Sequence, residues 1–409
     1  MTPVRVPRRP ALVVAVATLA LAACVPNAAN TGGAIAVTST DDACQVAVNE
    51  AQSGTVAFDV TNRGSKVTEF YLMADDGLRI IGEVENIAPG ASRTLTATVQ
   101  PGSYQTLCKP GMMGLAVGRS PFAVTGERVA ISGQDAEVKQ EAVDLYAAFV
   151  KEQVAQLVPA TQGFVDLYVA GDDEAAKDQF PDIRTHYERI EPVAEALGDL
   201  DPRIDYREID AKAEGLEWTG FHRIEKDLWE PARGALNSDG ETDAWQDWQP
   251  STPEGRAELG ERLEADVKEL YDFVHSEDFT TYLNDQGVDW LSNGAMALLD
   301  EVAAGKITGE EDWWSGTDLW DFAANVEGSK MAFTLVRDFA AGKGEEGTSL
   351  VERIDSGYTA LEEALATYGS LENGFVTYGE LTDEDKRNLT NLINSLAEPL
   401  SQLTSTILS

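Results

Sequence analysis

The sequence WTGFHRIEKDLW (residues 218–229) is aromatic-rich and has the pattern of a helix. Helical segments lie on both sides of it, so it belongs to a helical region that makes up the larger part of the chain. The chain has 3 histidines, and His222 in this stretch precedes Glu225 by three residues. Residues at this spacing share one helical face, so both side chains could reach a single metal ion. A lone His-x-x-Glu pair is also common by chance, and the two residues are then structural. The surrounding sequence has to decide between these interpretations.

The helical pattern extends from residue 134 to residue 409. Acidic amphipathic segments recur there, Gly and Pro fall between them, and no strand pattern interrupts them. The periodicity predicts helices over residues 135–157, 160–170, 173–197, 221–231, 254–275, 279–304, 317–341, 347–368 and 382–407. We therefore expect an all-α domain over residues 134–409, built from packed helical bundles.

Residues 35–126 have β character instead. Short alternating or β-branched runs are separated by turn signals such as Asn-Arg-Gly at residues 62–64 and Pro-Gly at residues 101–102. Seven or eight short strands at this spacing predict a small β-sandwich. The order of the runs resembles a cupredoxin domain, in which residues 102–108 match the strand that leads into the metal-binding loop. The chain is thus predicted to be multidomain, with an all-β sandwich followed by an all-α domain.

The first 23 residues have the features of a processing signal. A basic start with three arginines precedes an apolar run too short to span a bilayer, and Leu-Ala-Ala then leads to Cys24. This box resembles a bacterial lipoprotein cleavage site, so we expect a signal peptide over residues 1–23, lipidation of Cys24 and a flexible tether over residues 24–34. The alternative is an ordinary secretory signal. Either way the mature chain is expected to be exported, and the lipidated form would lie on the outer face of the cytoplasmic membrane.

The charge of the chain excludes one class of partner. Without residues 1–23 the chain has 28 basic against 70 acidic side chains, a net charge of −42. Such a surface repels nucleic acid and attracts cations. No phosphate-binding Gly-x-x-x-x-Gly-Lys loop occurs, so we expect no nucleotide, and no later apolar run is long enough for a second membrane anchor.

In the β domain, the residues with metal or redox chemistry are two cysteines and a glutamate. A blue-copper site needs two histidines and a cysteine, and no histidine precedes His186. Cys44 and Cys108 are therefore expected to form a disulfide, as pairs in exported domains usually do. The alternative is a second metal site, for copper or iron, with Glu69 as a third ligand.

In the helical domain, carboxylates accumulate around the opening stretch. Glu188 and Glu191 are three residues apart in a helical segment, and Asp199, Asp201 and Asp205 follow. A histidine with several carboxylates is a hard ligand set that suits iron, manganese or zinc. The alternative is a solvated acidic face. The zinc-peptidase pattern His-Glu-x-x-His is absent, as is Gly-x-Ser-x-Gly, so no catalytic residue is predicted.

Four blocks of this sequence resemble the EfeO branch of the imelysin family, and they are found at residues 187–195, 198–202, 218–229 and 317–328. The cupredoxin-like domain in front matches the longer, two-domain form of that branch. The resemblance implies an extracytoplasmic, iron-binding component of a ferrous-iron uptake system, without haem of its own. Its implied partners are a membrane permease and a haem peroxidase.

The resemblance also implies roles for individual residues. The family's His-x-x-Glu metal motif falls on His222 and Glu225, and its paired glutamates fall on Glu188 and Glu191. A further family aspartate is assigned to Asp205, with Asp199 and Asp201 as competing positions.

In the β domain, the resemblance places a second metal site at Cys44, Glu69 and Cys108. We therefore expect iron capture in the helical domain and delivery to the permease, with oxidation or electron relay by the β domain. Two other functions stay open at this point. One is an exported metallopeptidase that uses the same His-x-x-Glu site, and the other is a metal-free adhesion protein.

Overall fold

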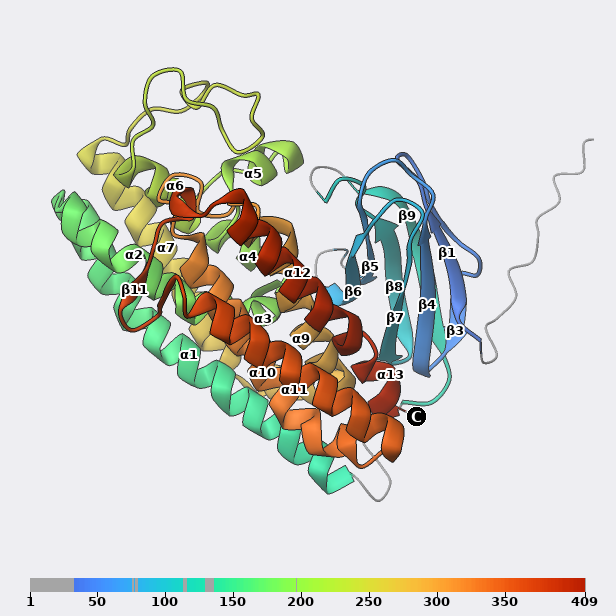
Figure 1. Cartoon of the computed structure of the whole chain (residues 1–409). Coiled ribbons are helices and arrows are strands. Elements are labelled where there is room, and N and C mark those ends of the chain that lie inside the picture. The colour runs from blue at the N-terminus through green and yellow to red at the C-terminus, as the bar shows by residue number, and fades with distance from the viewer. Residues whose placement is uncertain are drawn as a thin grey trace, which may run out of the picture.

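A β-sandwich lies beside a larger group of helices in the computed structural model of this chain (Figure 1). The structure describes residues 33–75, 77, 80–112, 116–128, 136–195 and 197–408. The expected signal peptide, Cys24 and most of the expected tether lie outside these residues. The arrangement confirms the predicted fold class, an all-β domain followed by an all-α domain.

The sandwich consists of a four-stranded sheet in the order β2-β1-β4-β7 and a five-stranded sheet in the order β3-β9-β8-β5-β6. Most neighbours are antiparallel, but β1 pairs with β4 and β3 pairs with β9 in parallel. The strands of the two sheets are β1 (Ile35–Ser39), β2 (Cys44–Val46), β3 (Glu50–Gln52), β4 (Gly54–Asn62), β5 (Thr68–Ala74), β6 (Ile80–Ile87), β7 (Ser92–Val99), β8 (Gly102–Cys108) and β9 (Val117–Thr125).

Alternation along the strands builds the core between the two sheets. In β4, Val56, Phe58 and Val60 are buried while the residues between them are more exposed, as period-2 patterning requires. Phe58 meets Phe70 and Phe122 with ring centroids 5.1 and 5.3 Å apart. This aromatic contact joins β4 to the opposite sheet.

The helical domain begins with the longest helix and ends near the sandwich (Figure 1). Its elements are α1 (Ala136–Ala170), α2 (Asp173–Glu188), α3 (Glu191–Glu195), α4 (Leu200–Ile204), α5 (Glu208–Glu214), α6 (Gly220–Leu228), α7 (Pro253–Val274), α8 (Glu277–Gln286), α9 (Val288–Glu301), the π-helical turn η1 (Val302–Lys306), α10 (Asp318–Ala341), α11 (Glu345–Leu365), β10 (Gly369–Ser370), β11 (Gly374–Phe375), the 3₁₀ turn η2 (Tyr378–Glu380), α12 (Asp383–Leu400) and α13 (Leu403–Leu408).

Two predicted helix boundaries are wrong, and proline is involved in both. Pro159 was expected to end a helix, but it lies inside α1, where Val154 and Leu157 before it and Phe164 after it are buried. Packing of that buried face outweighs the lost backbone hydrogen bond. Conversely, the helix predicted over residues 173–197 ends at Glu188, and α3 begins at Glu191. Pro192 has no N–H with which to continue the helix.

Other segments also differ from the sequence expectation. The short helices α4 and α5 were not predicted, and Gly287, with φ of 78°, divides the expected helix 279–304 into α8 and α9. A short hairpin formed by β10 and β11, with two residues in each strand, interrupts the region that was expected to contain helices alone. These pieces are too short for hydrophobic periodicity to show.

One contiguous apolar core runs through the helical domain, with members from α1 to α13. Among the described residues, no helix combines the length and the apolar character that crossing a bilayer needs.

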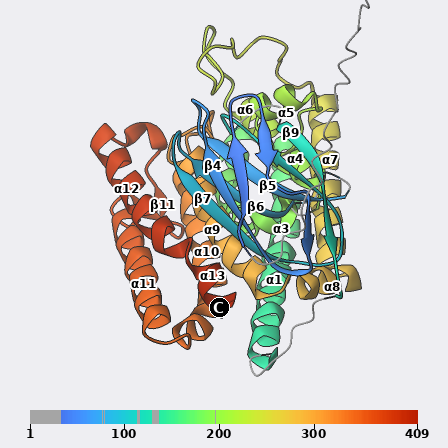
Figure 2. The ribbon, with the colours of Figure 1, turned by 90° about the vertical axis from the view of Figure 1, so that its right-hand side faces the viewer.

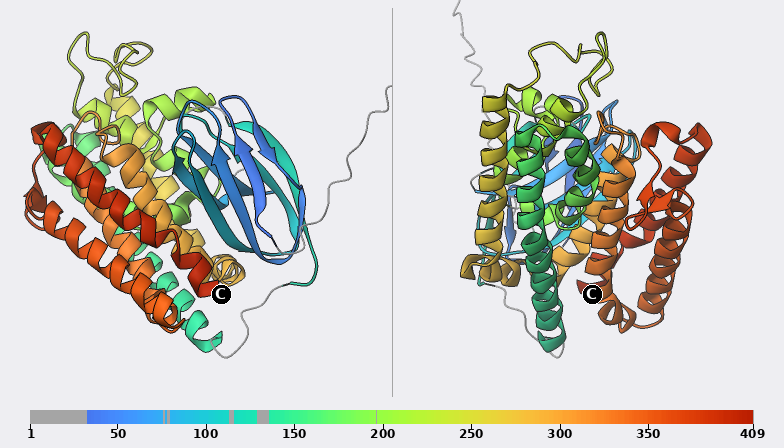
Figure 3. Two further views of the ribbon diagram at one scale, coloured as in Figure 1. Left: turned by 45° about the vertical axis from the view of Figure 1, so that its right-hand side comes forward. Right: turned by 90° about the vertical axis from the view of Figure 1, so that its left-hand side faces the viewer.

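Helix α9 is the main contact between the two domains. It lies against β6 and β7, on the side of the helical domain that faces the sandwich (Figures 2 and 3). Near its C-terminus, Asp300 forms an ion pair with Arg93 of β7 at 3.0 Å, and its backbone carbonyl accepts from Asn86 at 3.0 Å. At its N-terminus, Asp289 accepts the backbone N–H of Thr98. Specific polar contacts thus fix the sandwich on α9.

Candidate metal centre

Helix α6 carries the His-x-x-Glu pair, and its N-terminus is held tightly against α4. Gly220 has φ of 83°, and a Cβ atom there would lie 2.1 Å from the carbonyl oxygen of Ile204. Only glycine therefore permits this approach. Thr219 Oγ1 also donates to the Arg203 carbonyl at 2.9 Å. These contacts bring His222, two residues further on, next to Asp205 at the end of α4.

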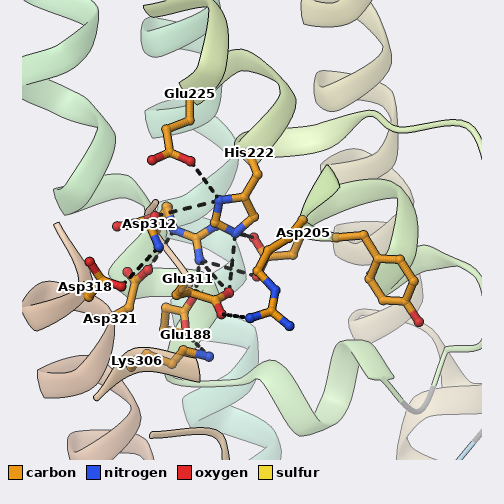
Figure 4. Close-up of polar contacts among 12 residues, drawn as sticks. Glu188, Asp205, His222, Glu225, Lys306, Glu311, Asp312, Asp318 and Asp321 are labelled. Carbon is orange, nitrogen blue, oxygen red and sulfur yellow. Dashed lines mark hydrogen bonds and ion pairs between the residues drawn. The ribbon is translucent and has the colours of Figure 1, made fainter. Parts of the chain in front are cut away.

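The imidazole ring of His222 is buried among carboxylates (Figure 4). Its Nδ1 lies 3.1 Å from Glu225 Oε2 and 3.8 Å from Asp312 Oδ1. Its Nε2 lies 3.4 Å from Glu311 Oε1 and 3.6 Å from Asp205 Oδ1. Both ring nitrogens therefore face acidic side chains, and they do so in different directions.

We call the buried carboxylates around this ring and below it the acidic cluster. They come from α2, α3, α6 and α10, from the residue that follows α4 and from the segment before α10, and all are buried. The members are Glu188, Glu191, Asp205, Glu225, Glu311, Asp312, Asp318 and Asp321.

Two buried cationic side chains offset part of this charge. Arg184, fully buried, pairs with Glu188 and Asp205 and donates from Nε to Asp321 Oδ2 at 2.9 Å. Lys306, at the end of η1, lies 3.3 Å from both Glu188 and Glu191. Since two cations face eight carboxylates, the cluster keeps a large surplus of buried negative charge. Such a surplus is costly unless protons or a further cation compensate it.

Several polar atoms of this site have no hydrogen-bond partner in the described part of the chain. They are His222 Nε2, Asp312 Oδ1, Asp318 Oδ2 and Asp321 Oδ1. Native proteins rarely leave buried polar atoms without a hydrogen bond, so several such atoms together mark this cluster as a candidate ligand site. A ring nitrogen and carboxylate oxygens are donors that a hard or borderline metal ion accepts.

The charges shift the pKa values in the metal-free protein. Burial, and then Arg184, would lower the pKa of His222, but the surrounding carboxylates outweigh them and raise it to about 10. Burial raises the pKa of Asp312 well above its usual range despite Arg184. Although burial opposes it, Lys306 holds the pKa of Glu311 well below its usual range. The raised pKa values of His222 and Asp312 mean that protons on these groups compensate part of the buried negative charge.

Backbone donors fix one of the predicted ligands in place. Glu225 Oε1 accepts the N–H groups of Trp314 and Ser315 at 2.9 and 2.7 Å, which leaves Oε2 directed at His222. Such contacts behind a metal ligand orient it and usually matter for affinity.

A small, partly open pocket adjoins the ring. It has a volume of about 20 Å³, which is close to the space needed by a single water molecule. Tryptophans and the long segment between α6 and α7 line it, and Trp313 Nε1 donates to the Leu236 carbonyl of that segment at 3.0 Å. The residues around it include His222, Glu225, Glu311, Trp218, Asn237 and Trp314.

The structure brings the predicted site residues together, but in two groups. Glu188, Glu191 and Asp205 have carboxylate oxygens within 4.8 Å of one another, whereas His222 and Glu225 form such a group with Asp312. Asp205 links the two because it also lies beside His222 Nε2.

The competing aspartates are placed differently. Asp201 Oδ1 accepts from the Tyr187 hydroxyl at 2.6 Å, and Asp199 precedes the first turn of α4. Of the three predicted candidates, Asp205 is the one that the structure places beside the imidazole.

Sequence reasoning missed the residues that complete the site. Glu311 and Asp312 follow η1, far from His222 in the chain, and Asp318 and Asp321 begin α10. The last two have the same spacing as His222 and Glu225, but acidic residues in a first helical turn are ordinary capping residues. Arg184 gave no signal at all. The spacing of three residues, and the position of Asp318 and Asp321 within the family-like block 317–328, were the available hints.

In the sandwich, Cys44 and Cys108 form a disulfide with their Cα atoms 5.4 Å apart. Sulfurs bonded to each other are not thiolates, so this form offers no thiolate to a metal. Glu69 is buried on β5, where its neighbour Phe70 is the residue that pairs with Cys108, and it accepts from the Tyr71 hydroxyl at 2.6 Å. Of the two expectations for this pair, the structure has the disulfide.

The burial of Glu69 can be tested through the pH dependence of stability. Burial raises its pKa from 4.5 to about 7, and Lys109 offsets part of the effect. A raised carboxyl pKa in the folded state contributes its full stability below the pKa of the unfolded chain. That stability is lost as the pH rises through the folded pKa of about 7, because the buried carboxyl then has to ionise. We expect Glu69→Gln to raise the free energy of unfolding by up to about 3 kcal/mol at pH 8 and by much less at pH 5. Urea unfolding at both values measures the gain.

The control for this test is Glu127→Gln, since Glu127 is exposed. Its effect should be small at both pH values. An equal gain from Glu69→Gln at pH 5 and pH 8 would show that Glu69 is already charged when folded.

Comparison with known proteins gives matches over both domains. A model of the cupredoxin-like domain matches residues 11–118, and the model described as Imelysin matches residues 142–403. The iron uptake system component EfeO of Escherichia coli (strain K12) is 36% identical over 400 residues, which cover 97% of each chain. The protein of the same description from Shigella flexneri has the same identity and coverage.

Proposed function

The chain belongs to the imelysin family, and from this membership we propose that it is the iron-binding component of an iron uptake system outside the cytoplasm. The proposal extends the description of its relatives, which are iron uptake system components and share 97% of their length with it. In this proposal the acidic cluster captures iron, and the chain passes it to a membrane permease.

One observation carries the proposal: the unpaired Nε2 of a buried histidine faces carboxylates that buried cations do not balance. Iron, as a hard to borderline ion, prefers such oxygen donors with a single imidazole. His222, Glu225 and Asp312 are the proposed ligands on one side of the ring. Asp205 and Glu311 are the proposed ligands on the other, and a single iron ion would use one of these two sets, because the two ring nitrogens point away from each other.

Glu188 and Glu191 have a supporting role in this proposal. Lys306 lies 3.3 Å from each of them, and Asn325 Nδ2 donates to each at 3.1 Å. Their charge is thus partly compensated by the protein itself. They attract a cation towards the cluster and keep Arg184 in place.

The rest of the proposal concerns the membrane and the partners. Lipidation at Cys24 would hold the chain at the outer face of the cytoplasmic membrane, next to a permease and a haem peroxidase of the same system. The sandwich, fixed on α9, would then serve oxidation or electron relay. Because its cysteines are paired, such a relay would use a metal held by carboxylates of the sandwich.

The size of the cavity argues against the alternative of a metallopeptidase. A peptidase needs a cleft open to a peptide and a free coordination position beside a base. The cavity next to His222 has a volume of about 20 Å³. That space suits an ion or a water molecule.

The test of this function is His222→Ala, because the ring nitrogen has no substitute in the cluster. We expect iron affinity to fall at least about 100-fold, since even residues behind a ligand cost 10- to 100-fold. Titration of the metal-free protein with ferrous iron under anaerobic conditions, and with ferric iron in a weak chelator, measures the effect.

His275→Ala is the matched control, because His275 caps α7 and is not part of the acidic cluster. It should leave iron affinity unchanged. If His222→Ala binds iron as tightly as the wild-type chain, the cluster is not the iron site and the proposed function fails.

A further inference from the structure

The His222 ring has a complete set of possible ligands at each of its two nitrogens. On one side, Nδ1, Glu225 and Asp312 offer atoms that all lie within 4.8 Å of one another. On the other side, Nε2, Asp205 and Glu311 do the same. The two nitrogens of an imidazole point away from each other, so one ion cannot contact both.

The distances on both sides fit coordination. Two donors that are each about 2.1 Å from an ion lie about 3.0 Å apart at right angles and about 4.2 Å apart when opposite. The contacts of Nδ1 to Glu225 and Asp312 are 3.1 and 3.8 Å. Those of Nε2 to Glu311 and Asp205 are 3.4 and 3.6 Å. All four values fall within that window.

Each side also has an unpaired buried atom. On the Nε2 side it is the ring nitrogen itself, and His222 is 2% exposed. On the Nδ1 side it is Asp312 Oδ1, and Asp312 is 0% exposed. Both atoms make only longer ion-pair contacts, Asp312 Oδ1 with Arg184 Nε at 3.5 Å and His222 Nε2 with Glu311 Oε1 at 3.4 Å, and neither has a hydrogen bond among the described residues.

The charge of the acidic cluster exceeds what one ion neutralises. Its eight carboxylates face the two buried cations Arg184 and Lys306. Arg207, at its edge, donates mainly to Asp210 at 2.6 Å and lies 3.8 Å from Glu311. With all eight carboxylates ionised, one divalent ion would still leave a net charge of about −4, which a second cation or protons on the carboxylates would have to compensate.

We propose that His222 lies between two cation positions, one at each ring nitrogen, and that both are filled at saturation. This inference rests on the proposed iron-binding function and adds a second ion to it. The ring bridges the two ions, and each of its nitrogens releases its proton to solvent as the ion binds there. Glu225 and Asp312 hold the ion at Nδ1, while Asp205 and Glu311 hold the ion at Nε2.

Two neighbouring residues on opposite sides of the ring make the test sharp. Asp312→Asn weakens the Nδ1 position, and Glu311→Gln weakens the Nε2 position, with little change in shape. The metal-free full chain is titrated with Zn²⁺, which has no redox chemistry, and separately with Fe²⁺ under anaerobic conditions. Bound ions per chain are counted by calorimetry and by metal analysis after gel filtration.

The expected result is a stepwise loss. The wild-type chain binds two more ions than His222→Ala, each single variant loses one of them, and the double variant loses both. Asp266→Asn is the control, because Asp266 is 5% exposed, has an unpaired Oδ2 and is outside the cluster. It should keep both ions. Circular dichroism confirms that each variant is folded.

Other outcomes separate the inference from the function. The wild-type chain could bind one more ion than His222→Ala, with both single variants lowering the affinity for that ion. In that case the two-position inference fails while the proposed function stands. If each single variant still binds that one ion, the positions are alternatives and the inference also fails. If the wild type and His222→Ala bind equally, the proposed function itself fails.

Discussion

Replacing Arg184 by methionine is expected to destabilise the metal-free protein by about 3–5 kcal/mol, the usual cost of removing one partner from a buried ion-pair network. Arg184 is fully buried and contacts Glu188, Asp205 and Asp321 directly. Methionine has a similar length but no charge, so these carboxylates lose their counter-ion in an environment without water. They would then have to take up protons or repel one another.

Denaturant unfolding of the metal-free protein measures this loss, and metal provides a second measurement. A bound cation restores part of the missing positive charge, so saturating Zn²⁺ should stabilise Arg184→Met more than it stabilises the wild type. Arg337→Met is the control, because Arg337 pairs with Asp355 at the surface and such pairs contribute about 0–1 kcal/mol. If the Arg184 variant lost less than the surface control, Arg184 would not be the main counter-ion of the cluster.

Breaking the Cys44–Cys108 disulfide is expected to cost about 4 kcal/mol of stability in the sandwich, because the bond closes a long loop. The two cysteines are 64 residues apart, and they join β2 at the edge of one sheet to β8 within the other. In the unfolded chain this bond removes much of the conformational freedom. The core around it, with Cys108 fully buried, cannot easily adapt to its loss.

Cys44→Ala with Cys108→Ala, compared with the wild type in urea, measures this contribution. Treatment of the wild type with a reductant should reproduce the effect of the double substitution. Alkylation of the denatured but unreduced protein, followed by peptide mapping, should leave both cysteines unlabelled. Labelling of both, together with a metal that is lost in the double variant, would instead establish the second metal site.

The sequence predicts the large-scale organisation well because each domain has its own periodicity. Alternation in β4 and the helical pattern of α7 and α11 are strong local signals. The boundary between the two domains follows directly from them. The predicted helix end at Pro159 is wrong because the low helix propensity of proline is outweighed by burial of the apolar face of α1 on either side of it.

The site could be predicted in part, for a related reason. His222 and Glu225 are neighbours on one helix, so their spacing reveals them. Glu311 and Asp312 reach the ring from a segment that the sequence does not tie to α6. Nothing in the local sequence distinguishes Arg184 from the other arginines, because its burial depends on tertiary structure. Contacts between distant segments carry the charge balance of the site, and no local pattern encodes them.

Two consecutive residues at the end of α9 have a consequence for communication between the domains. Asp300 binds Arg93 of the sandwich, and Glu301 lies 3.6 Å from Lys306, which contacts Glu188 and Glu191 of the acidic cluster. One short stretch of backbone therefore joins an anchor of the sandwich to a counter-ion of the metal centre. Suppose that a movement of the sandwich on α9 changes the affinity of the chain for iron by some factor. Linkage then requires that iron binding shifts the equilibrium of that movement by the same factor.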